Sequence, residues 1–434
     1  MVKYIAQRKP LIFLLLAFIA SNIIFWPGIV SPDAAGQYAA AQAGVYTDHH
    51  PPVMSFVWRY LDQLYAGSGL ILLMHLIMLY TAAAILVVIF KDSKFKWWYA
   101  ILPLIPNIFS YTPLIVKDVG FAYSYLLAAA ILAWLMVNKT EKNKYVLLLL
   151  VISLLFYGTA VKYQARFLLI FLTLGVGYCF QYQANKRAII TGVVLCLLLL
   201  QAMFSFNKLL VPNTQESHSW QLVKLYDLAA ISIALDHAEF PEFVKQNPNY
   251  SFSKIKQQFS SREVDPLVFV PNAVLKGGNT AQQRTELLSY WRKTVLSNPG
   301  LYLQHRLRLW THNFFSVPSA RSHPANFFKN TSLGPLLNNQ QIYTMIDVAY
   351  KTLSIALQFI WLLPLLLFYS YLSIVNFNKN KYAVPLLMFS CVSLTLLGVL
   401  FFMSMASTAR YVFICTCLVH ASHGFAYRAF RRSS

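Results

Sequence analysis

Apolar residues gather in runs of about 20 along most of the chain, which is the length a helix needs to cross a bilayer. We predict an all-α polytopic membrane protein with ten spanning helices, each bounded to within several residues. The third span is the least regular, because it contains Pro103, Pro106 and Pro113 and meets the fourth at a short turn, Lys117-Asp118. The spans are expected near residues 11–30, 69–90, 97–115, 119–137, 145–161, 166–183, 188–209, 352–375, 383–405 and 409–425.

Two longer polar segments interrupt these runs and set the expected domain organisation. Residues 31–68 are expected to form amphipathic helices, and residues 210–351 are numerous enough for a small domain. Within the second segment, residues 283–298 and 300–315 have helical patterns, and the stretch 271–280 predicts a loop. We therefore expect a transmembrane core over 1–209, a mainly helical non-cytoplasmic domain over 210–351, and C-terminal membrane helices with a cytoplasmic tail over 352–434.

The composition supports lipid as the main solvent of the chain. Only 12% of the 434 residues are charged, whereas a soluble chain carries about 25%. The net charge of +21 does not indicate nucleic-acid binding, because much of the basic excess lies in short loops and no basic soluble module is present. The five cysteines all fall inside apolar runs, so neither a disulfide framework nor a zinc site is expected.

The basic residues also predict an orientation, because positive charges concentrate in cytoplasmic loops. We predict a multi-pass protein of a cell membrane, of the bacterial inner-membrane kind, with both termini cytoplasmic and the first apolar run retained as a span. The inner segments then hold Lys3, Arg8, Lys9, Lys91, Lys94, Lys96, Lys139, Lys142, Lys144, Lys186, Arg187, Lys379, Lys381, Arg428, Arg431 and Arg432. The shorter outer loops hold Arg59, Lys117, Lys162, Arg166 and Arg410.

The first outer loop carries the strongest candidate chemistry. Ser31 can cap a helix that has Pro32 at its first position and Asp33 in its first turn. Asp33 either complements the helix dipole or faces a lipid headgroup at the exit of the first span. Gln37 and Tyr38 follow on the same short, alanine-rich helix and are candidate substrate contacts.

The loop continues with a histidine pair before a second helix, expected from Val53 to Tyr65. His49 and His50 precede Pro51-Pro52, which favours an extended exit, and Tyr46 lies just upstream. The pair is either a plain turn with solvated histidines or a contact to a phosphate or sugar. A metal site has less support, since no second cluster of ligands is visible.

Further charges fall in the other outer loops. Lys117-Asp118 is either a local ion pair at a tight membrane turn or a phosphate contact followed by a sugar contact or second acid. Lys162 and Arg166 would share a helix face if their helix is continuous. The two cations either bind a shared anion, which would relieve their repulsion, or snorkel to lipid headgroups. Arg410-Tyr411 is either an interfacial anchor or a donor contact.

The large outer segment has a basic, aromatic stretch that allows two interpretations. Arg306-Leu-Arg308-Leu-Trp310 is flanked by His305 and His312, and Arg321-Ser-His323 follows. The stretch is either a solvated helix face or an acceptor site for an anionic partner.

The topology, the acid after the first span and the stretch Gly44-x-Tyr46-x-x-x-His50-Pro51-Pro52 resemble the GT-C fold integral-membrane glycosyltransferases. The pattern is most similar to lipid A aminoarabinose transferases and protein O-mannosyltransferases. The resemblance implies a polyprenyl-phosphate sugar donor used on the outer face, with Arg410-Tyr411 near the donor phosphate. Many members have two acids where this chain has Pro32-Asp33-Ala34, which weakens a metal-dependent mechanism and leaves Asp33 as the single candidate base.

This set of residues suits glycosyl transfer. A lipid phosphate leaves without a general acid but needs cations, for which Lys117, Lys162, Arg166 and Arg410 are candidates. Asp33 would act as general base on the acceptor, which favours inversion. No cofactor is firmly expected, a divalent cation stays open, and the expected partners are membrane lipid, a polyprenyl-phosphate sugar and a glycan, lipid or protein acceptor. The alternatives are an O-antigen-type polymerase or ligase, and a lipid-linked-sugar transporter or flippase.

Overall fold

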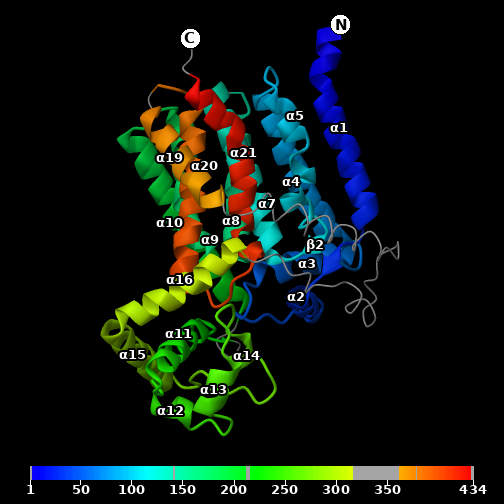
Figure 1. Ribbon diagram of the computed structural model, residues 1–434. Helices are drawn as coiled ribbons and strands as arrows, with labels where there is room; N and C mark the ends of the chain where they lie inside the picture. The colour runs from blue at the N-terminus through cyan, green and yellow to red at the C-terminus, as the bar shows by residue number, and fades with distance from the viewer. Residues whose placement is uncertain (1, 140–141, 212–215, 316–360, 378, 432–434) are drawn as a thin grey trace. The chain divides into compact units, whose positions relative to one another are not determined.

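The computed structural model describes residues 2–139, 142–211, 216–315, 361–377 and 379–431 (Figure 1). These residues divide into two compact units. Unit 1 is drawn from 1–215, 317–396 and 412–434, and unit 2 from 216–316 and 397–411. The sequence-based division did not anticipate that residues 397–411 join the outer segment rather than the C-terminal membrane helices.

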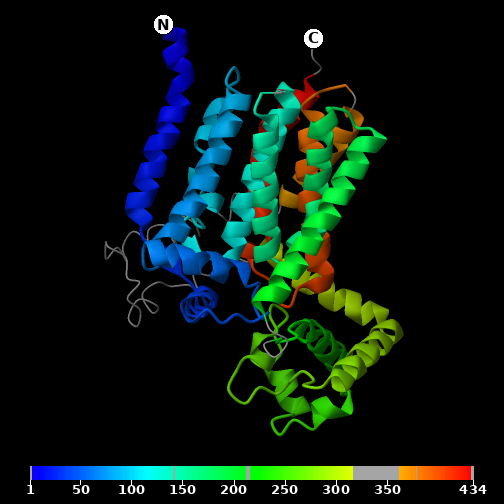
Figure 2. The same cartoon turned by 180° about the vertical axis from the view of Figure 1, so that it is seen from behind.

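Unit 1 is a bundle of apolar helices, which confirms an all-α membrane protein (Figures 1 and 2). Six helices among the described residues are long and apolar enough to cross a bilayer. They are α1 (Val2–Phe25), α4 (Gly69–Ile89), α7 (Lys117–Asn138), α8 (Lys144–Val161), α10 (Lys186–Leu210) and α20 (Ala383–Met403), joined by the shorter apolar helices α9 (Ala165–Gln181) and α19 (Leu362–Val375) and by α21 (Phe413–Phe430).

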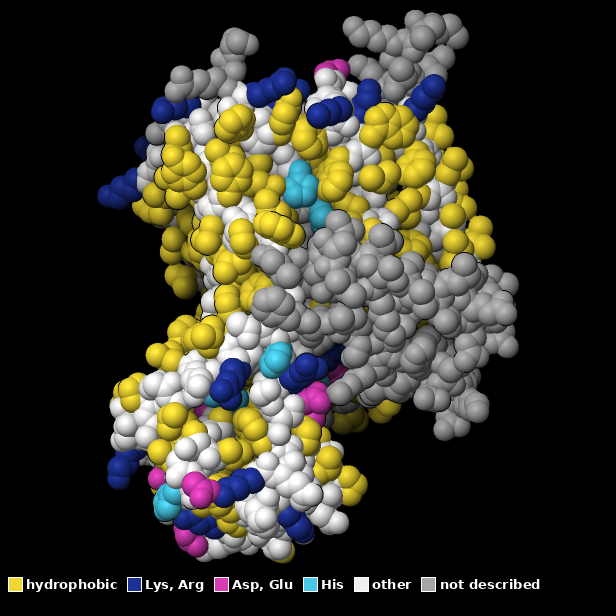
Figure 3. Space-filling model, viewed as in Figure 1, with side chains coloured by type: hydrophobic (Ala, Val, Ile, Leu, Met, Phe, Trp, Pro, Cys, Tyr) yellow, Lys and Arg dark blue, Asp and Glu magenta, His cyan; other side chains and the backbone are white. Residues whose placement is uncertain are grey.

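Helix α7 forms the centre of this bundle. It packs against α4, α8, α9 and α21, and nearly all of its side chains are buried. In contrast, α1 and α10 expose large apolar side chains such as Leu16, Ile23 and Leu197. On the face shown in Figure 3, hydrophobic side chains make up most of the described surface of unit 1, whereas Lys and Arg gather at the end where α21 ends. An apolar belt with a basic end is the surface expected of a bundle solvated by lipid.

The predicted third span, 97–115, is not one helix. It consists of α5 (Phe95–Ala100), a 3-10 turn η1 (Leu102–Leu104), α6 (Pro106–Phe109) and strand β2 (Leu114–Ile115). Pro103 is the second residue of η1, and Pro106 is the first residue of α6. The helix is interrupted at both positions because proline has no N–H to donate to the preceding turn. The last span also begins later than expected, since residues 409–412 form the 3-10 turn η5 (Ala409–Val412) before α21.

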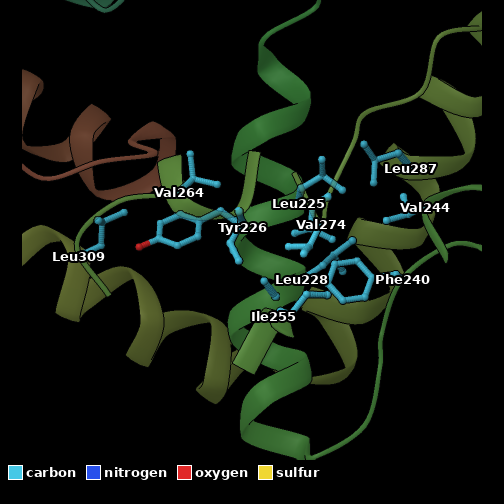
Figure 4. Packing of buried hydrophobic residues seen from close by; sticks show 13 residues of the cluster. Leu225, Tyr226, Leu228, Phe240, Val244, Ile255, Val264, Val274, Leu287 and Leu309 are labelled. Carbon is cyan, nitrogen blue, oxygen red and sulfur yellow. The ribbon is translucent and has the colours of Figure 1, made fainter. Parts of the chain in front are cut away.

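Unit 2 is built from helices around its own apolar core (Figure 4). Tyr226, Leu228 and Phe240 are among its fully buried members. The two predicted helices are confirmed as α15 and α16, and Thr280 ends the predicted loop with a capping box at the start of α15. The helices are α11 (Trp220–Leu235), α12 (Glu242–Lys245), α13 (Phe252–Gln258), α14 (Asp265–Val268), α15 (Ala281–Ser297) and α16 (Pro299–Phe315).

Candidate functional site

A two-stranded parallel sheet organises the candidate site in unit 1. Strand β1 (Ile29–Val30) pairs with β2, with Ile29 opposite Leu114 and Val30 opposite Ile115. Because parallel strands end at the same edge, the segments that follow them start side by side. Helix α2 (Pro32–Ala43) follows β1, and α7 follows β2.

The two strand–helix junctions place one acid each at equivalent positions. Asp33 is the second residue of α2, and Asp118 is the second residue of α7. Each acid is the third residue after its strand, so the register sets the two at matching points of the same edge. The Oγ of Ser31 accepts a hydrogen bond from the Ala34 amide at 3.2 Å, which confirms the predicted cap with proline at the first helical position.

Asp33 lies beside a histidine and a lysine from other elements. Its carboxylate Oδ1 is 4.0 Å from His50 Nε2, and Lys117 Nζ donates to His50 Nδ1 at 2.8 Å. Asp33 and His50 remain partly exposed, at 36% and 23% of the side chain. The structure therefore brings together a reachable carboxylate, an imidazole and an ammonium.

The lysine contact fixes the protonation state of His50. An ammonium group has only donors, so His50 Nδ1 must accept and the imidazole is neutral. Its remaining proton then sits on Nε2, the nitrogen that faces Asp33. The separation of 4.0 Å between His50 Nε2 and Asp33 Oδ1 is longer than a hydrogen bond, so the two groups are neighbours rather than a bonded pair.

His49 lies against the same group of charges. Its ring centroid is 4.6 Å from that of His50. Burial lowers the pKa of His49 and the charge of Lys117 lowers it further, whereas Asp33 and Asp48 oppose the shift. His49 is therefore neutral at neutral pH and can both donate and accept a hydrogen bond.

Asp118 is an ion-paired residue inside unit 1. Its Oδ1 accepts from Lys162 Nζ, and the two side chains are only 3% and 4% exposed. Lys162 is therefore not one of two unpaired cations. Its helix is not continuous with that of Arg166 either, because Lys162 is the residue at which α8 ends and Arg166 is the second residue of α9. The expectation of two cations on one helix face is thus wrong, since the chain turns between them.

Arg166 instead lies between two aromatic rings. Its guanidinium carbon is 4.8 Å from the centroid of Tyr163 and 4.7 Å from that of Phe204. Tyr163 donates its hydroxyl proton to the Asp48 carbonyl at 2.6 Å, and burial raises the pKa of Tyr163, so it stays a donor. This contact ties the turn between α8 and α9 to the histidine loop. The sequence analysis missed Tyr163 and Asp48, although both stand next to residues that it selected.

The remaining candidates of the first loop differ in their surroundings. Gln37 is buried, and within the described residues neither atom of its amide has a hydrogen-bond partner. Tyr38 donates to Asp62 Oδ1 at 2.8 Å, and burial together with this bond raises the pKa of Tyr38 to about 12. Tyr46 is buried against Phe56. Helix α3 (Val53–Leu64) begins where predicted, but its cap, Pro52, is already in the αR region, so the exit is a turn rather than extended chain.

Arg410 and Tyr411 belong to unit 2 and are described within it. The Arg410 guanidinium carbon lies 5.5 Å from the centroid of the neighbouring Tyr411 ring. Both residues stand in η5, directly before α21. Arg410 is thus a cation that lies beside an aromatic ring.

The basic stretch of α16 is not simply a solvated face. Arg306 is fully buried, and its guanidinium contacts Asp227 Oδ1 at 2.6 Å and Oδ2 at 2.7 Å. His305 is also buried, 3.6 Å from the same carboxylate, and Trp291 donates to Asp227 at 2.8 Å. Arg308 is exposed, and Arg321 and His323 lie outside the described residues. Arg306 therefore stabilises the interior of unit 2 and is not available to an anionic partner.

Two further findings concern metal binding and similarity to known proteins. Among the described residues, no group of three or more histidine, cysteine or acidic side chains is arranged to hold a metal ion. The chain matches no protein-family model, no characterised protein and no solved structure.

Proposed function

We propose that this chain is a membrane glycosyltransferase that moves a sugar from a polyprenyl-phosphate donor to a lipid, glycan or protein acceptor. One observation carries the proposal: Asp33, His50 and Lys117 meet at the edge where β1 and β2 end. The apolar helices around this edge would keep a polyprenyl chain in lipid while its phosphate and sugar reach the charged groups.

Asp33 is assigned the role of general base. It accepts the proton of the acceptor hydroxyl or amine as that atom bonds to the anomeric carbon of the sugar. The bond between the anomeric carbon and the phosphate oxygen breaks, and the polyprenyl phosphate leaves with the electron pair. Attack opposite the leaving group inverts the configuration. His50, whose Nε2 lies 4.0 Å from the carboxylate, is assigned as its neighbouring contact to phosphate or sugar.

Lys117 is assigned to the donor phosphate. Its ammonium group, which also donates to His50, would stabilise the negative charge that develops on the leaving oxygen. Arg166, Arg410 and Tyr411 are proposed as further donor contacts. Lys162 is assigned instead to holding Asp118, which serves as sugar contact or second acid.

Gln37 and His49 are assigned to the sugar. A buried amide without partners costs free energy, and sugar hydroxyls would satisfy both its donor and its acceptor. Neutral His49 offers a second donor and acceptor pair. Tyr38 and Tyr46 support this surface from α2 and from the loop after it.

The donor assignment is tested with purified protein in lipid vesicles. Labelled sugars are offered as polyprenyl-phosphate or as nucleotide donors, and product formation is followed over donor concentration. We expect transfer only from the lipid donor, with a KM for that donor at least tenfold higher in Lys117→Met, because about 1.5–3 kcal/mol is lost with a charged hydrogen bond. Lys142→Met, in the turn before α8, should match the wild type. Equal KM values for Lys117→Met and wild type would contradict the assignment.

A further inference from the structure

Within unit 2, residues 404–408, which precede Arg410, form hydrogen bonds with residues 262–264, Arg306 and Asn313. The Val264 amide donates to the Met405 carbonyl at 3.0 Å, and Glu263 and Ala406 form an antiparallel bridge. The Ser407 amide and hydroxyl both donate to the Arg262 carbonyl, at 2.7 and 3.1 Å. Residues 405–407 are thereby paired with 262–264 as a short piece of extended structure.

Arg306 binds the same segment at its start. Its Nη1 donates to the Ser404 carbonyl at 2.6 Å, and Ser404 directly follows the last residue of α20. A cation at this place stabilises the carbonyl end of a helix. Because Arg306 also pairs with Asp227 of α11, it joins the end of α20 to the interior of unit 2.

Asn313 binds the segment at its other end. Its side chain is fully buried, and its Oδ1 accepts from the Thr408 amide at 3.0 Å. Its Nδ2 donates to the Trp310 carbonyl at 3.2 Å, which fixes the orientation of the amide. The Tyr411 amide then donates to the Thr408 carbonyl at 3.0 Å, and the buried Ala409 lies between them. The position of Thr408 therefore sets the start of the turn that carries Arg410 and Tyr411.

We infer that Arg306 and Asn313 are positioning residues, through which unit 2 fixes residues 404–408 and with them the turn that carries Arg410 and Tyr411. Neither side chain is proposed to touch the substrate, since both are fully buried and hydrogen-bonded to protein groups. The inference rests on the proposed function for the role of Arg410. The binding of residues 404–408 by unit 2 does not depend on that function and can be tested without it.

The test compares Asn313→Ala with Thr311→Ala. Thr311 lies on the same helix, and its hydroxyl bonds only within that helix, to the Arg308 carbonyl. Hydrogen exchange of the peptide that spans 404–411 is measured in vesicles. Loss of one hydrogen bond should speed this exchange about threefold to tenfold in Asn313→Ala and leave it unchanged in Thr311→Ala. Unchanged exchange in Asn313→Ala would overturn the inference.

The link to the donor is tested by a double-mutant cycle with Arg410→Ala. We expect each single substitution to raise the KM for the lipid donor, and Asn313→Ala to add nothing once Arg410 is absent. If the two effects multiply, Asn313 does not act through Arg410 and the inference fails. If Arg410→Ala leaves the KM unchanged, the proposed role of Arg410 as a donor contact is contradicted. If the wild type transfers no sugar at all, the proposed function fails, while the exchange measurement still decides whether unit 2 holds the segment.

Discussion

At the scale of single residues, the structure pairs Asp118 with Lys162, although the sequence presented each as a separate candidate ligand. From sequence, each charge at a membrane turn is a candidate ligand, because an unpaired charge there is costly. In the fold the two neutralise each other in the interior of unit 1. Their pairing could not be predicted, since it joins the start of α7 to the end of α8 and depends on how those helices pack.

Lys162→Met is expected to destabilise the protein by about 3–5 kcal/mol, because it removes one partner of a buried ion pair. Thermal unfolding in detergent measures the loss. Combining Lys162→Met with Asp118→Leu should restore most of the stability, because two apolar side chains then replace the pair. A single variant that unfolds at the wild-type temperature would show that the ion pair is unimportant.

At the scale of elements, the β1–β2 pair decides which residues meet. Gly28 leads into β1 with φ +99°, a conformation that L side chains rarely adopt. A Cβ there would lie 2.8 Å from the Ile115 side chain and 3.3 Å from the Pro113 carbonyl. The close approach of β1 to β2 therefore requires glycine at this position.

Gly28→Ala is expected to cost about 1–3 kcal/mol of stability and to reduce transfer, because it strains the backbone and separates β1 from β2. Gly36→Ala, within α2, is the matched control. A Cβ at Gly36 meets nothing within 4 Å, so this change should stabilise α2 by about 0.5–1 kcal/mol. Melting temperatures that shift in opposite directions support this role of the strand pair, whereas equal shifts contradict it.

The sequence predicted the long elements and missed the short ones. Apolar length indicated α4, α8 and α10, and the cap of α2 followed from Ser31-Pro32. The two-residue strands have no periodicity to detect, and their partners lie far apart in the chain. Charge and side of the membrane led us to expect Asp33 near Lys117, Lys162, Arg166 and Arg410. The meeting of Asp33 with His50 was not expected, because its geometry depends on that strand pair.

At the scale of the whole molecule, unit 1 is suited to lipid and unit 2 to water. Unit 1 exposes apolar side chains around its helices, whereas unit 2 encloses a separate core and exposes charged residues such as Arg308 and Lys276. The division into two units was largely visible in the hydropathy. The inclusion of 397–411 in unit 2 was not, because it depends on hydrogen bonds that this segment makes with Arg262, Arg306 and Asn313.

The orientation is tested by labelling single cysteines from outside the membrane, in a variant without the native cysteines. We expect cysteine at position 33 to react with an impermeant reagent and cysteine at position 142 to react only after permeabilisation, because basic loops stay inside. The two positions lie at opposite ends of the bundle of unit 1, at the starts of α2 and α8 (Figure 1). Labelling at 142 alone would reverse the predicted topology.

The role of Asp33 as general base is tested most directly by the initial rate of sugar transfer in vesicles that hold equal amounts of folded protein. Asp33→Asn keeps the size of the side chain and removes the base, so the rate should fall by about 10²–10⁴-fold. Asp92→Asn, in the exposed turn after α4, should leave the rate unchanged. Transfer by Asp33→Asn within twofold of the wild type would contradict the account.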